Sequence, residues 1–169
     1  MFVLMASLAF AVDPAVSGSY QLDHSAEELS DVHAVAVQSA INGLPWALRE
    51  FARRPVRRVI YNCGRLGIAL SDDELTLGCD EKQDKVMRRT TDGHATLDGY
   101  GEPVDVQMST TPSSLSVQFE RSEGAVTTQY ILDGDQLRVR KSLNSHRLPE
   151  PVVWEVRYRR AVVVEPPTD

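Results

Sequence analysis

The sequence is poor in the residues that carry most catalytic and metal chemistry. Its 169 residues include two cysteines and four histidines, and no C-x-x-C pair places two thiols at the spacing of a structural zinc site. No G-x-S-x-G, H-E-x-x-H or glycine-rich phosphate loop occurs, so the common hydrolases, metalloproteases and nucleotide-binding proteins have no motif in support. We therefore expect no catalytic residue, no metal and no cofactor, in a protein that is not an enzyme.

A basic surface is missing as well. The net charge of −6 argues against a nucleic-acid-binding protein, which needs a positively charged face. Aromatic residues make up only 7% of the chain, which favours a narrow or filled interior over a wide cavity.

We expect no transmembrane segment in the mature chain. Residues 1–12 are free of charge and proline, but a run of about a dozen residues is too short to cross a bilayer as a helix and suits the core of a signal peptide. Ala9-Phe10-Ala11 supplies a small-x-small cleavage pattern, although no basic residue precedes the run. We expect an exported protein, periplasmic or extracellular, from which residues 1–11 are removed. The alternative is that this run forms a buried first strand.

The rest of the chain fits one domain. A chain of this length buries about two thirds of its unfolded surface, and no repeat or linker divides it. We predict a single domain over residues 12–164 and a disordered tail over residues 165–169.

Apolar and polar residues alternate in short segments from Arg57 onward. In Val152–Arg159 one parity reads Val, Trp, Val, Tyr and the other reads Val, Glu, Arg, Arg, so a strand here has one apolar face. Turn residues separate such segments about every ten residues, as in meandering barrels. The predicted strands are 17–22, 57–63, 65–71, 74–80, 85–90, 94–98, 104–110, 114–121, 125–132, 136–144 and 151–160.

Two helices are expected between the first two of these strands. Ser25-Ala26-Glu27-Glu28 is a capping box, a signature of a helix N-terminus. Asn42-Gly43 is suited to end that helix in left-handed backbone. A second helix is predicted to begin at Pro45 and to end at Pro55. The predicted fold is mainly β, an antiparallel up-and-down barrel of about 8–10 strands with a helix-turn-helix inserted after the first strand.

Cys63 and Cys79 are the two cysteines. If residues 66–70 and 75–79 pair as a hairpin, Leu66 faces Cys79 and Cys63 lies three residues beyond that partner, roughly 10 Å along the strand. A bulge at Gly64 would close the gap. A disulfide and two separately buried thiols both remain open.

The first and last strands carry a further pattern. Gly18-Ser19-Tyr20 stands where lipocalins place Gly-x-Trp, and Arg159 or Arg160 stands where that family keeps an arginine packed over the aromatic ring. In this respect the chain resembles uncharacterised lipocalin-like, calycin-type barrels of bacterial exported proteins. The resemblance implies that Gly18, Tyr20 and Arg159 close the base of the barrel, because a guanidinium group binds an aromatic face.

The order of strand, helix-turn-helix and meander is also similar to that of fatty-acid-binding proteins, in which the helix pair covers the barrel mouth. Residues 49–58 hold five arginines and one glutamate. We predict that Arg49, Arg53 and Arg57 surround the mouth and orient an anionic ligand. The alternative is a solvated face whose arginines pair with surface acids. Contact of this basic helix with a membrane surface is a variant of the first prediction.

The predicted inward positions give the expected ligand site. Tyr61, Met108, Phe119, Trp154 and Tyr158 are expected to line an apolar cavity with polar tips; the alternative is a solid core. We predict non-enzymatic binding or carriage of a small hydrophobic or amphipathic molecule in the cell envelope. The competing prediction is a protein-interaction or structural module of the envelope with a filled barrel.

Overall fold

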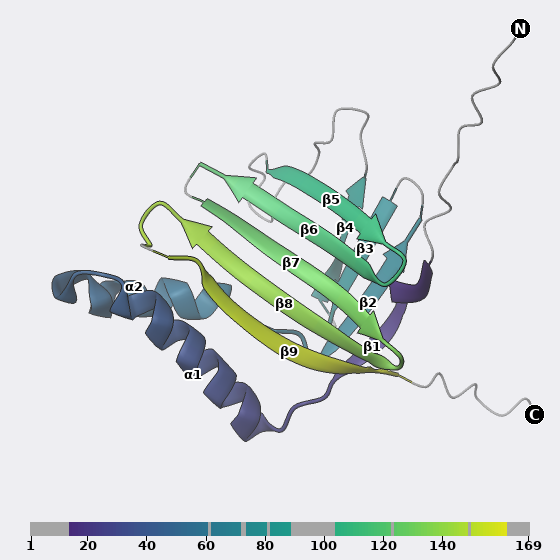
Figure 1. Cartoon of the computed structure of the whole chain (residues 1–169), viewed down its shortest axis with the longest axis horizontal. Helices are drawn as coiled ribbons and strands as arrows, with labels where there is room; N and C mark the ends of the chain where they lie inside the picture. The colour runs from purple at the N-terminus through teal and green to yellow at the C-terminus, as the bar shows by residue number, and fades with distance from the viewer. Residues whose placement is uncertain are drawn as a thin grey trace, which may run out of the picture.

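The computed structural model describes residues 14–60, 62–71, 74–80, 82–88, 104–122, 124–148 and 150–161. Two helices and nine strands lie in these ranges, after a short 3-10 helix at Pro14–Val16 (Figure 1). The helices are α1 (Ala26–Asn42) and α2 (Trp46–Val59). The strands are β1 (Gly18–Leu22), β2 (Arg65–Leu70), β3 (Glu74–Cys79), β4 (Lys82–Arg88), β5 (Asp105–Thr111), β6 (Ser114–Arg121), β7 (Gly124–Asp133), β8 (Gln136–Ser145) and β9 (Val152–Arg160).

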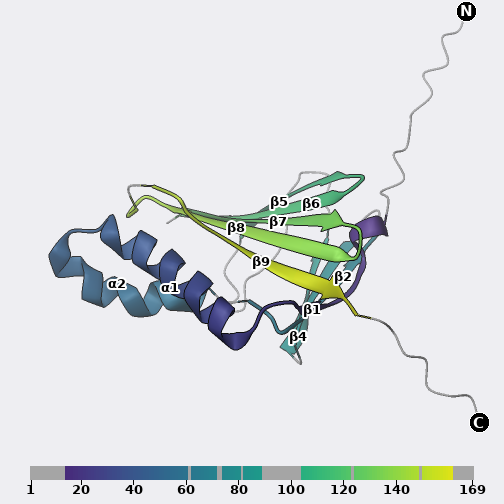
Figure 2. The same cartoon turned by 60° about the horizontal axis from the view of Figure 1, so that its bottom comes forward.

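All nine strands belong to one antiparallel sheet in the order β4-β3-β2-β1-β9-β8-β7-β6-β5. The first and last strands meet, because Tyr20 of β1 pairs with Arg160 of β9. Figures 1 and 2 show β1 to β4 passing behind and across β5 to β9, so the sheet curls into a half-barrel. The predicted fold class, mainly β with a helix-turn-helix after the first strand, is confirmed.

The alternation of the sequence sets which face of each strand is buried. In β9 the residues Val152, Trp154, Val156 and Tyr158 are buried and their neighbours are exposed. Successive side chains of a strand point to opposite faces, so these four share the concave face of the half-barrel.

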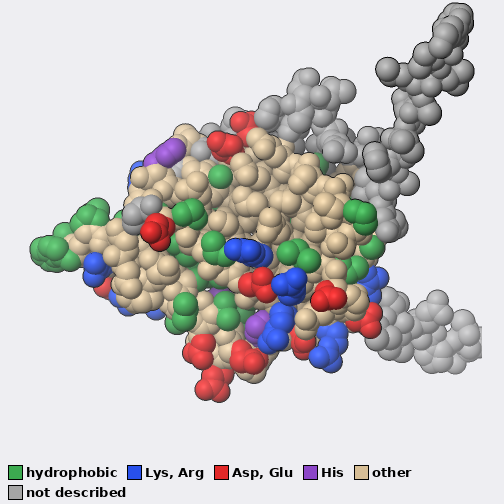
Figure 3. Space-filling view, in the orientation of Figure 1, with side chains coloured by type: hydrophobic (Ala, Val, Ile, Leu, Met, Phe, Trp, Pro, Cys, Tyr) green, Lys and Arg blue, Asp and Glu red, His purple; other side chains and the backbone are tan. Residues whose placement is uncertain are grey.

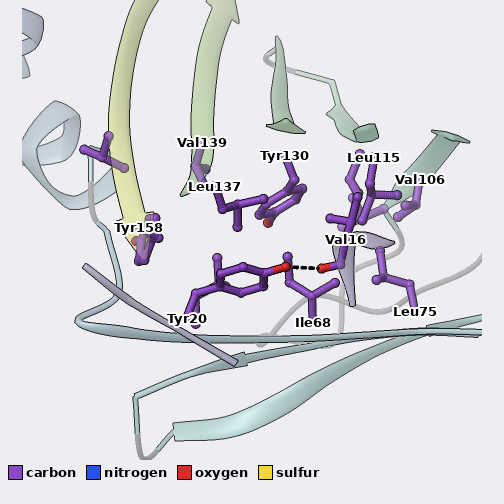
Figure 4. Close-up of a cluster of buried hydrophobic side chains, with 14 residues drawn as sticks. Val16, Tyr20, Ile68, Leu75, Val106, Leu115, Tyr130, Leu137, Val139 and Tyr158 are labelled. Atoms are coloured by element: carbon purple, nitrogen blue, oxygen red, sulfur yellow. Dashed lines mark hydrogen bonds between the residues drawn. The ribbon is translucent and has the colours of Figure 1, made fainter. Parts of the chain in front are cut away.

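The curled sheet has two layers, β1 to β4 and β5 to β9. A group of buried side chains, which we call the base cluster, fills the space between these layers next to β1. Leu75, Leu115 and Leu137 within it are 0% exposed, and side chains from both layers converge (Figure 4). Side chains from both layers therefore fill the space around these residues. The base cluster consists of Val16, Tyr20, Leu66, Ile68, Leu75, Val104, Val106, Leu115, Val117, Tyr130, Leu137, Val139, Val156 and Tyr158.

A second buried group, the lid cluster, joins the helices to the first half of β9. Because Val152 and Trp154 share the concave face with Val156, α1 and α2 cover the inner side of the sheet at this end (Figure 2). The helix pair thus lies over the end of the half-barrel opposite the base cluster. The lid cluster consists of Ala36, Val37, Ala40, Val56, Ile60, Val152 and Trp154.

The predicted end of the second helix at Pro55 and the predicted strand over 57–63 are wrong. Helix α2 continues through Pro55 to Val59. A proline inside a helix costs about 3 kcal/mol. However, Val56, which follows Pro55, and Ile60, one turn after Val56, are both buried in the lid cluster with residues of α1 and β9. This packing is available only if the helix continues, and it outweighs the local preference.

The predicted start of α1 is confirmed. The Ser25 hydroxyl accepts a hydrogen bond from the Glu28 amide (3.1 Å), and the Ser25 amide donates to the Glu28 carboxylate (2.9 Å). The helix ends at Asn42, but the following Gly43 has φ −70° and is not left-handed. Instead, Arg49 donates to the Leu44 carbonyl (3.0 Å) and to the Asn42 carbonyl (3.2 Å), so an arginine of α2 caps the end of α1.

The remaining predicted strands from 65 onward agree with β2 to β9, with β4 beginning at Lys82. The predicted strand 94–98, the predicted signal peptide over 1–11 and the predicted tail over 165–169 lie outside the described residues. In the part of the chain that the structure describes, no helix is long and apolar enough to span a membrane.

Cys63 and Cys79 form a disulfide, with their Cα atoms 5.2 Å apart. The hairpin register is the predicted one, Leu66 opposite Cys79. The backbone bends at Gly64, just before β2, so Cys63 does not continue the straight line of the strand. The Leu22 amide of β1 still donates to the Gly64 carbonyl (2.9 Å), which extends the pairing of β1 with β2. The first of the two open alternatives, a disulfide, is the correct one.

Candidate functional site

The closure of the half-barrel involves Arg160, and the predicted role of Arg159 is wrong. The Arg160 guanidinium lies over the Tyr20 ring, 5.4 Å from its centroid, and donates to the Tyr20 hydroxyl (3.1 Å). Arg159 points to the opposite face and forms an ion pair with Asp23 at 3.2 Å. The one-residue difference follows from strand parity, since Arg160 shares the inner face of Tyr158.

Tyr20 is held on all sides at this closure. Its hydroxyl donates to the Val16 carbonyl (2.8 Å; Figure 4). Burial raises the pKa of Tyr20, and the nearby Arg160 partly opposes the rise. Gly18 has φ +151°, and a Cβ built there would meet the Tyr20 ring at 3.6 Å and the Arg160 guanidinium at 3.7 Å. Gly18 and Tyr20 therefore belong to the structural closure of the half-barrel, as predicted, and the left-handed φ of Gly18 favours glycine at this position.

The residues predicted to line a cavity are divided between the two clusters. Met108 and Phe119 are half-buried against the base cluster, and Tyr158 belongs to it, with its hydroxyl donating to the Cys63 carbonyl (2.9 Å). Trp154 lies in the lid cluster, and Tyr61 lies outside the described residues. Among the described side chains, the structure therefore places Met108, Phe119 and Tyr158 at the base cluster and Trp154 apart from them in the lid cluster.

A groove of about 540 Å³ lies between the two helices. Because α1 and α2 are antiparallel and joined by a short turn, the groove runs between the middle of α1 and the second half of α2. Its lining residues are Ser30, His33, Ala34, Val37 and Gln38 of α1, Arg53 and Arg57 of α2, and Ile60 just after α2.

The groove has an apolar part and a cationic part. Ala34, Val37 and Ile60 supply the apolar surface. Arg53 and Arg57 are four residues apart, so they lie on one face of α2. The Nε atom of Arg53 lies 3.9 Å from the Glu50 carboxylate, close enough for an ion pair but too far for a hydrogen bond. This buried atom has no hydrogen-bond acceptor among the described residues. A buried donor of this kind is stabilised when an anion or a water binds to it.

His33 joins the groove to the interior. The Asn62 side-chain amide lies 2.8 Å from His33 Nε2 and forms a hydrogen bond with it. Burial lowers the pKa of His33, and the positive charge of Lys141 lowers it further. Lys141 is on β8 and shares the inner face of Leu137 and Val139.

A row of polar groups crosses the concave face beneath His33. Thr128, Lys141 and Trp154 are neighbours on β7, β8 and β9. Thr128 and Trp154 are both buried, and within the described part of the chain the indole Nε1 of Trp154 meets no acceptor. All three side chains offer hydrogen-bond donors. Hydrogen-bond donors and positive charge thus occur both in the groove between the helices and in this row on the concave face of the sheet.

The lowered pKa of His33 predicts that acid destabilises the fold. The unfolded chain takes up a proton near the ordinary pKa of 6.5 and the folded chain only at lower pH. The contribution of neutral His33 to the free energy of unfolding is therefore fully present above pH 6.5 and is lost as the pH falls through and below that value. We expect the urea-unfolding free energy of His33→Gln to fall less between pH 7.5 and 5 than that of the wild type.

His146 provides the matched control, because it is an exposed histidine in the turn after β8. His146→Gln should keep the wild-type pH dependence. If the free energy of unfolding fell equally with pH in the wild type and in His33→Gln, His33 would not be the cause of the acid destabilisation.

Sequence reasoning located part of this site. It proposed Arg53 and Arg57, which line the groove, and Arg49, which instead caps α1. His33 and Val37 were not predicted, because the predicted ligand-contacting residues lie on the expected strands and among the arginines of α2. The spacing of Ser30, Ala34, Val37 and Gln38 marks a second stripe of α1, and that spacing is the signal in the sequence that points to the groove.

Comparison with known proteins gives the fold its context. No protein-family model matches the chain, and no curated protein sequence matches it. Solved structures do match. An abundant heat-soluble (SAHS) protein of Ramazzottius varieornatus superposes with a TM-score of 0.55 at 14% identity, covering 87% of this chain and 96% of that one.

Two fatty-acid-binding proteins match similarly. That of Schistosoma mansoni, solved in complex with arachidonic acid, has a TM-score of 0.52 at 13% identity, with 89% of this chain and 99% of the other covered. Fatty-acid-binding protein 1 of Echinococcus granulosus has a TM-score of 0.50 at 9% identity, with 88% and 98% covered. At this identity the likeness shows the fold, and the chain has the lipocalin and fatty-acid-binding-protein type of half-barrel with a helix-turn-helix after its first strand.

Proposed function

We propose that this protein binds a small amphipathic molecule with an anionic end, without catalysing a reaction on it, in the groove between α1 and α2. The observation that carries the proposal is the composition of the groove: two arginines beside an apolar surface, in a hollow of about 540 Å³. Small-molecule sites in proteins have volumes of about 300–1,000 Å³ and combine apolar walls with a few polar groups.

The anionic end is inferred from the cations. Arg53 and Arg57 offer guanidinium groups, which bind carboxylate and phosphate groups with paired hydrogen bonds. The buried Arg53 Nε gains an acceptor when an anion binds. His33 is neutral in the unliganded state, and an anion beside it would favour its protonated form.

The apolar part is inferred from Ala34, Val37 and Ile60, next to the lid cluster. Burial of an alkyl chain against these side chains contributes about 25 cal/mol for each Å² of apolar surface removed from water. The names of the two fatty-acid-binding proteins support the same class of ligand for this fold. The fold itself supports the binding of a hydrophobic molecule. Our proposal adds that this molecule has an anionic end and that the protein acts in the cell envelope.

The solid base cluster favours a second candidate, a protein-interaction or structural module of the cell envelope. Five of its side chains, such as Leu75 and Val117, are 0% exposed, so this part of the interior is occupied by packed side chains. In that case function would reside on the outer surface, and the groove would bind nothing selectively.

Decanoate and decanol distinguish the two candidates, because they differ mainly in the charge of the head group. We expect the wild type to bind decanoate about tenfold more tightly than decanol in calorimetric titrations, since one charge-assisted hydrogen bond contributes about 1.5 kcal/mol. Arg53→Gln combined with Arg57→Gln should remove this preference and leave decanol affinity unchanged.

Arg140→Gln is the matched control, because Arg140 is an exposed arginine on the outer face of β8. It should retain the preference for decanoate. Absence of saturable binding of either probe by the wild type would refute the ligand-binding proposal and support the interaction module.

A further inference from the structure

The turn between the helices exposes large apolar side chains. Trp46 is 84% exposed and Leu48 is 53% exposed, and both follow Pro45 in the first turn of α2. We call Pro45, Trp46 and Leu48 the apolar tip. Figure 3 shows apolar side chains gathered at the end of the molecule where the α1–α2 turn projects in Figure 1.

The apolar tip is part of the positive pole of an acidic protein. Residues 49–58 hold five arginines and one glutamate, a net charge of +4, whereas the whole chain has −6 and the remainder therefore −10. Arg49 is fixed next to the tip by its two hydrogen bonds to the carbonyls of Asn42 and Leu44. Its positive charge is thus held in place beside Trp46.

Folding alone does not account for the apolar tip. The helices pack on the sheet and on each other through Ala36, Ala40, Val56 and Ile60, and the side chains of the tip face away from this core. Single exposed apolar residues are common on proteins, but a tryptophan and a leucine beside clustered arginines form the combination that binds membrane interfaces.

We propose that the apolar tip docks on a membrane surface that contains anionic lipids. Trp46 and Leu48 enter the headgroup region, and Arg49, held beside the tip, contacts the anionic headgroups. Charge complementarity selects this partner over a second copy of the chain, because two tips of the same positive charge repel each other. The proposal does not depend on the ligand of the groove.

Tryptophan fluorescence tests the docking directly, because the chain has two tryptophans, one in the apolar tip and one buried. Vesicles of equal parts phosphatidylglycerol and phosphatidylcholine should shift the wild-type emission to shorter wavelength, and lipids brominated on the acyl chain should quench it. Trp46→Phe should lose this response, while Trp154→Phe should keep it.

Co-sedimentation with the same vesicles measures the affinity without relying on fluorescence or on the buried tryptophan. Trp46→Ala should bind about tenfold more weakly, since about 60 Å² of apolar surface no longer enters the interface. Arg49→Gln should bind about fivefold more weakly, and added salt should weaken binding by the wild type. Val35→Ala, which alters another exposed apolar residue outside the tip, should bind like the wild type.

Two results would overturn the proposal. One is the absence of binding by the wild type to the phosphatidylglycerol vesicles, or equal binding to vesicles of phosphatidylcholine alone. The other is a dimer in analytical ultracentrifugation that Trp46→Ala abolishes, without vesicle binding, which would assign the tip to a second copy.

Discussion

Replacing both cysteines by serine is expected to lower the free energy of unfolding by about 3 kcal/mol. Cys63 and Cys79 are 16 residues apart in sequence, and a disulfide that closes a loop of about this length stabilises by that amount through restriction of the unfolded chain. The bond also fixes the turn before β2, where the Cys63 carbonyl accepts a hydrogen bond from Tyr158 of β9. It therefore connects the β2–β3 hairpin to the layer that carries the lid.

Urea unfolding of the wild type, with and without reductant, and of the double variant measures this effect. Reduction of the wild type should give nearly the same loss as the double substitution, and the double variant should not respond to reductant. A loss below about 1 kcal/mol would mean that the bond contributes little beyond the hairpin contacts themselves.

Leu137→Ala is expected to destabilise the protein by about 3 kcal/mol. Leu137 is fully buried in the base cluster, between the two layers of the half-barrel (Figure 4). Truncation of a buried leucine to alanine costs about 2–5 kcal/mol, because it removes apolar contacts and leaves a cavity in a closely packed core. The size of the loss therefore reports whether the base is solid.

Val153→Ala is the matched control, because Val153 lies on the outer face of β9 and is 44% exposed. Its substitution should change the stability by less than about 0.5 kcal/mol. If Leu137→Ala had an equally small effect, the base cluster would be loosely packed or hollow. The interior of the half-barrel would then be a second candidate for the ligand site, beside the groove.

Local patterns in the sequence were sufficient for most of the sheet. The alternation in Val152–Arg159 places four side chains on the concave face, and the same alternation, continued by two residues from Tyr158, assigns Arg160 to the closure. The capping box at Ser25 fixes the start of α1 because both of its hydrogen bonds are local.

Features that depend on tertiary packing were not accessible in this way. Proline at position 55 normally ends a helix, and only the contacts of Val56 and Ile60 with α1 and β9 explain why α2 continues. The disulfide depends on a bend at Gly64, whose carbonyl accepts a hydrogen bond from Leu22 of β1, 42 residues earlier in the chain. The groove exists because two helices meet at a particular separation; the stripe of Ser30, Ala34 and Gln38 marks the face of α1 that lines it, but not the separation itself.

The titration with decanoate, followed at the backbone amides by NMR, tests the central claim most directly. Our account predicts that the largest saturable shifts occur at Ala34, Val37 and Ile60, around the two arginines of the groove. Amides of the base cluster, such as those of Leu115 and Leu137, should move little. Saturable shifts centred on the base cluster with an unchanged helix pair would contradict it, because the ligand would then lie inside the half-barrel.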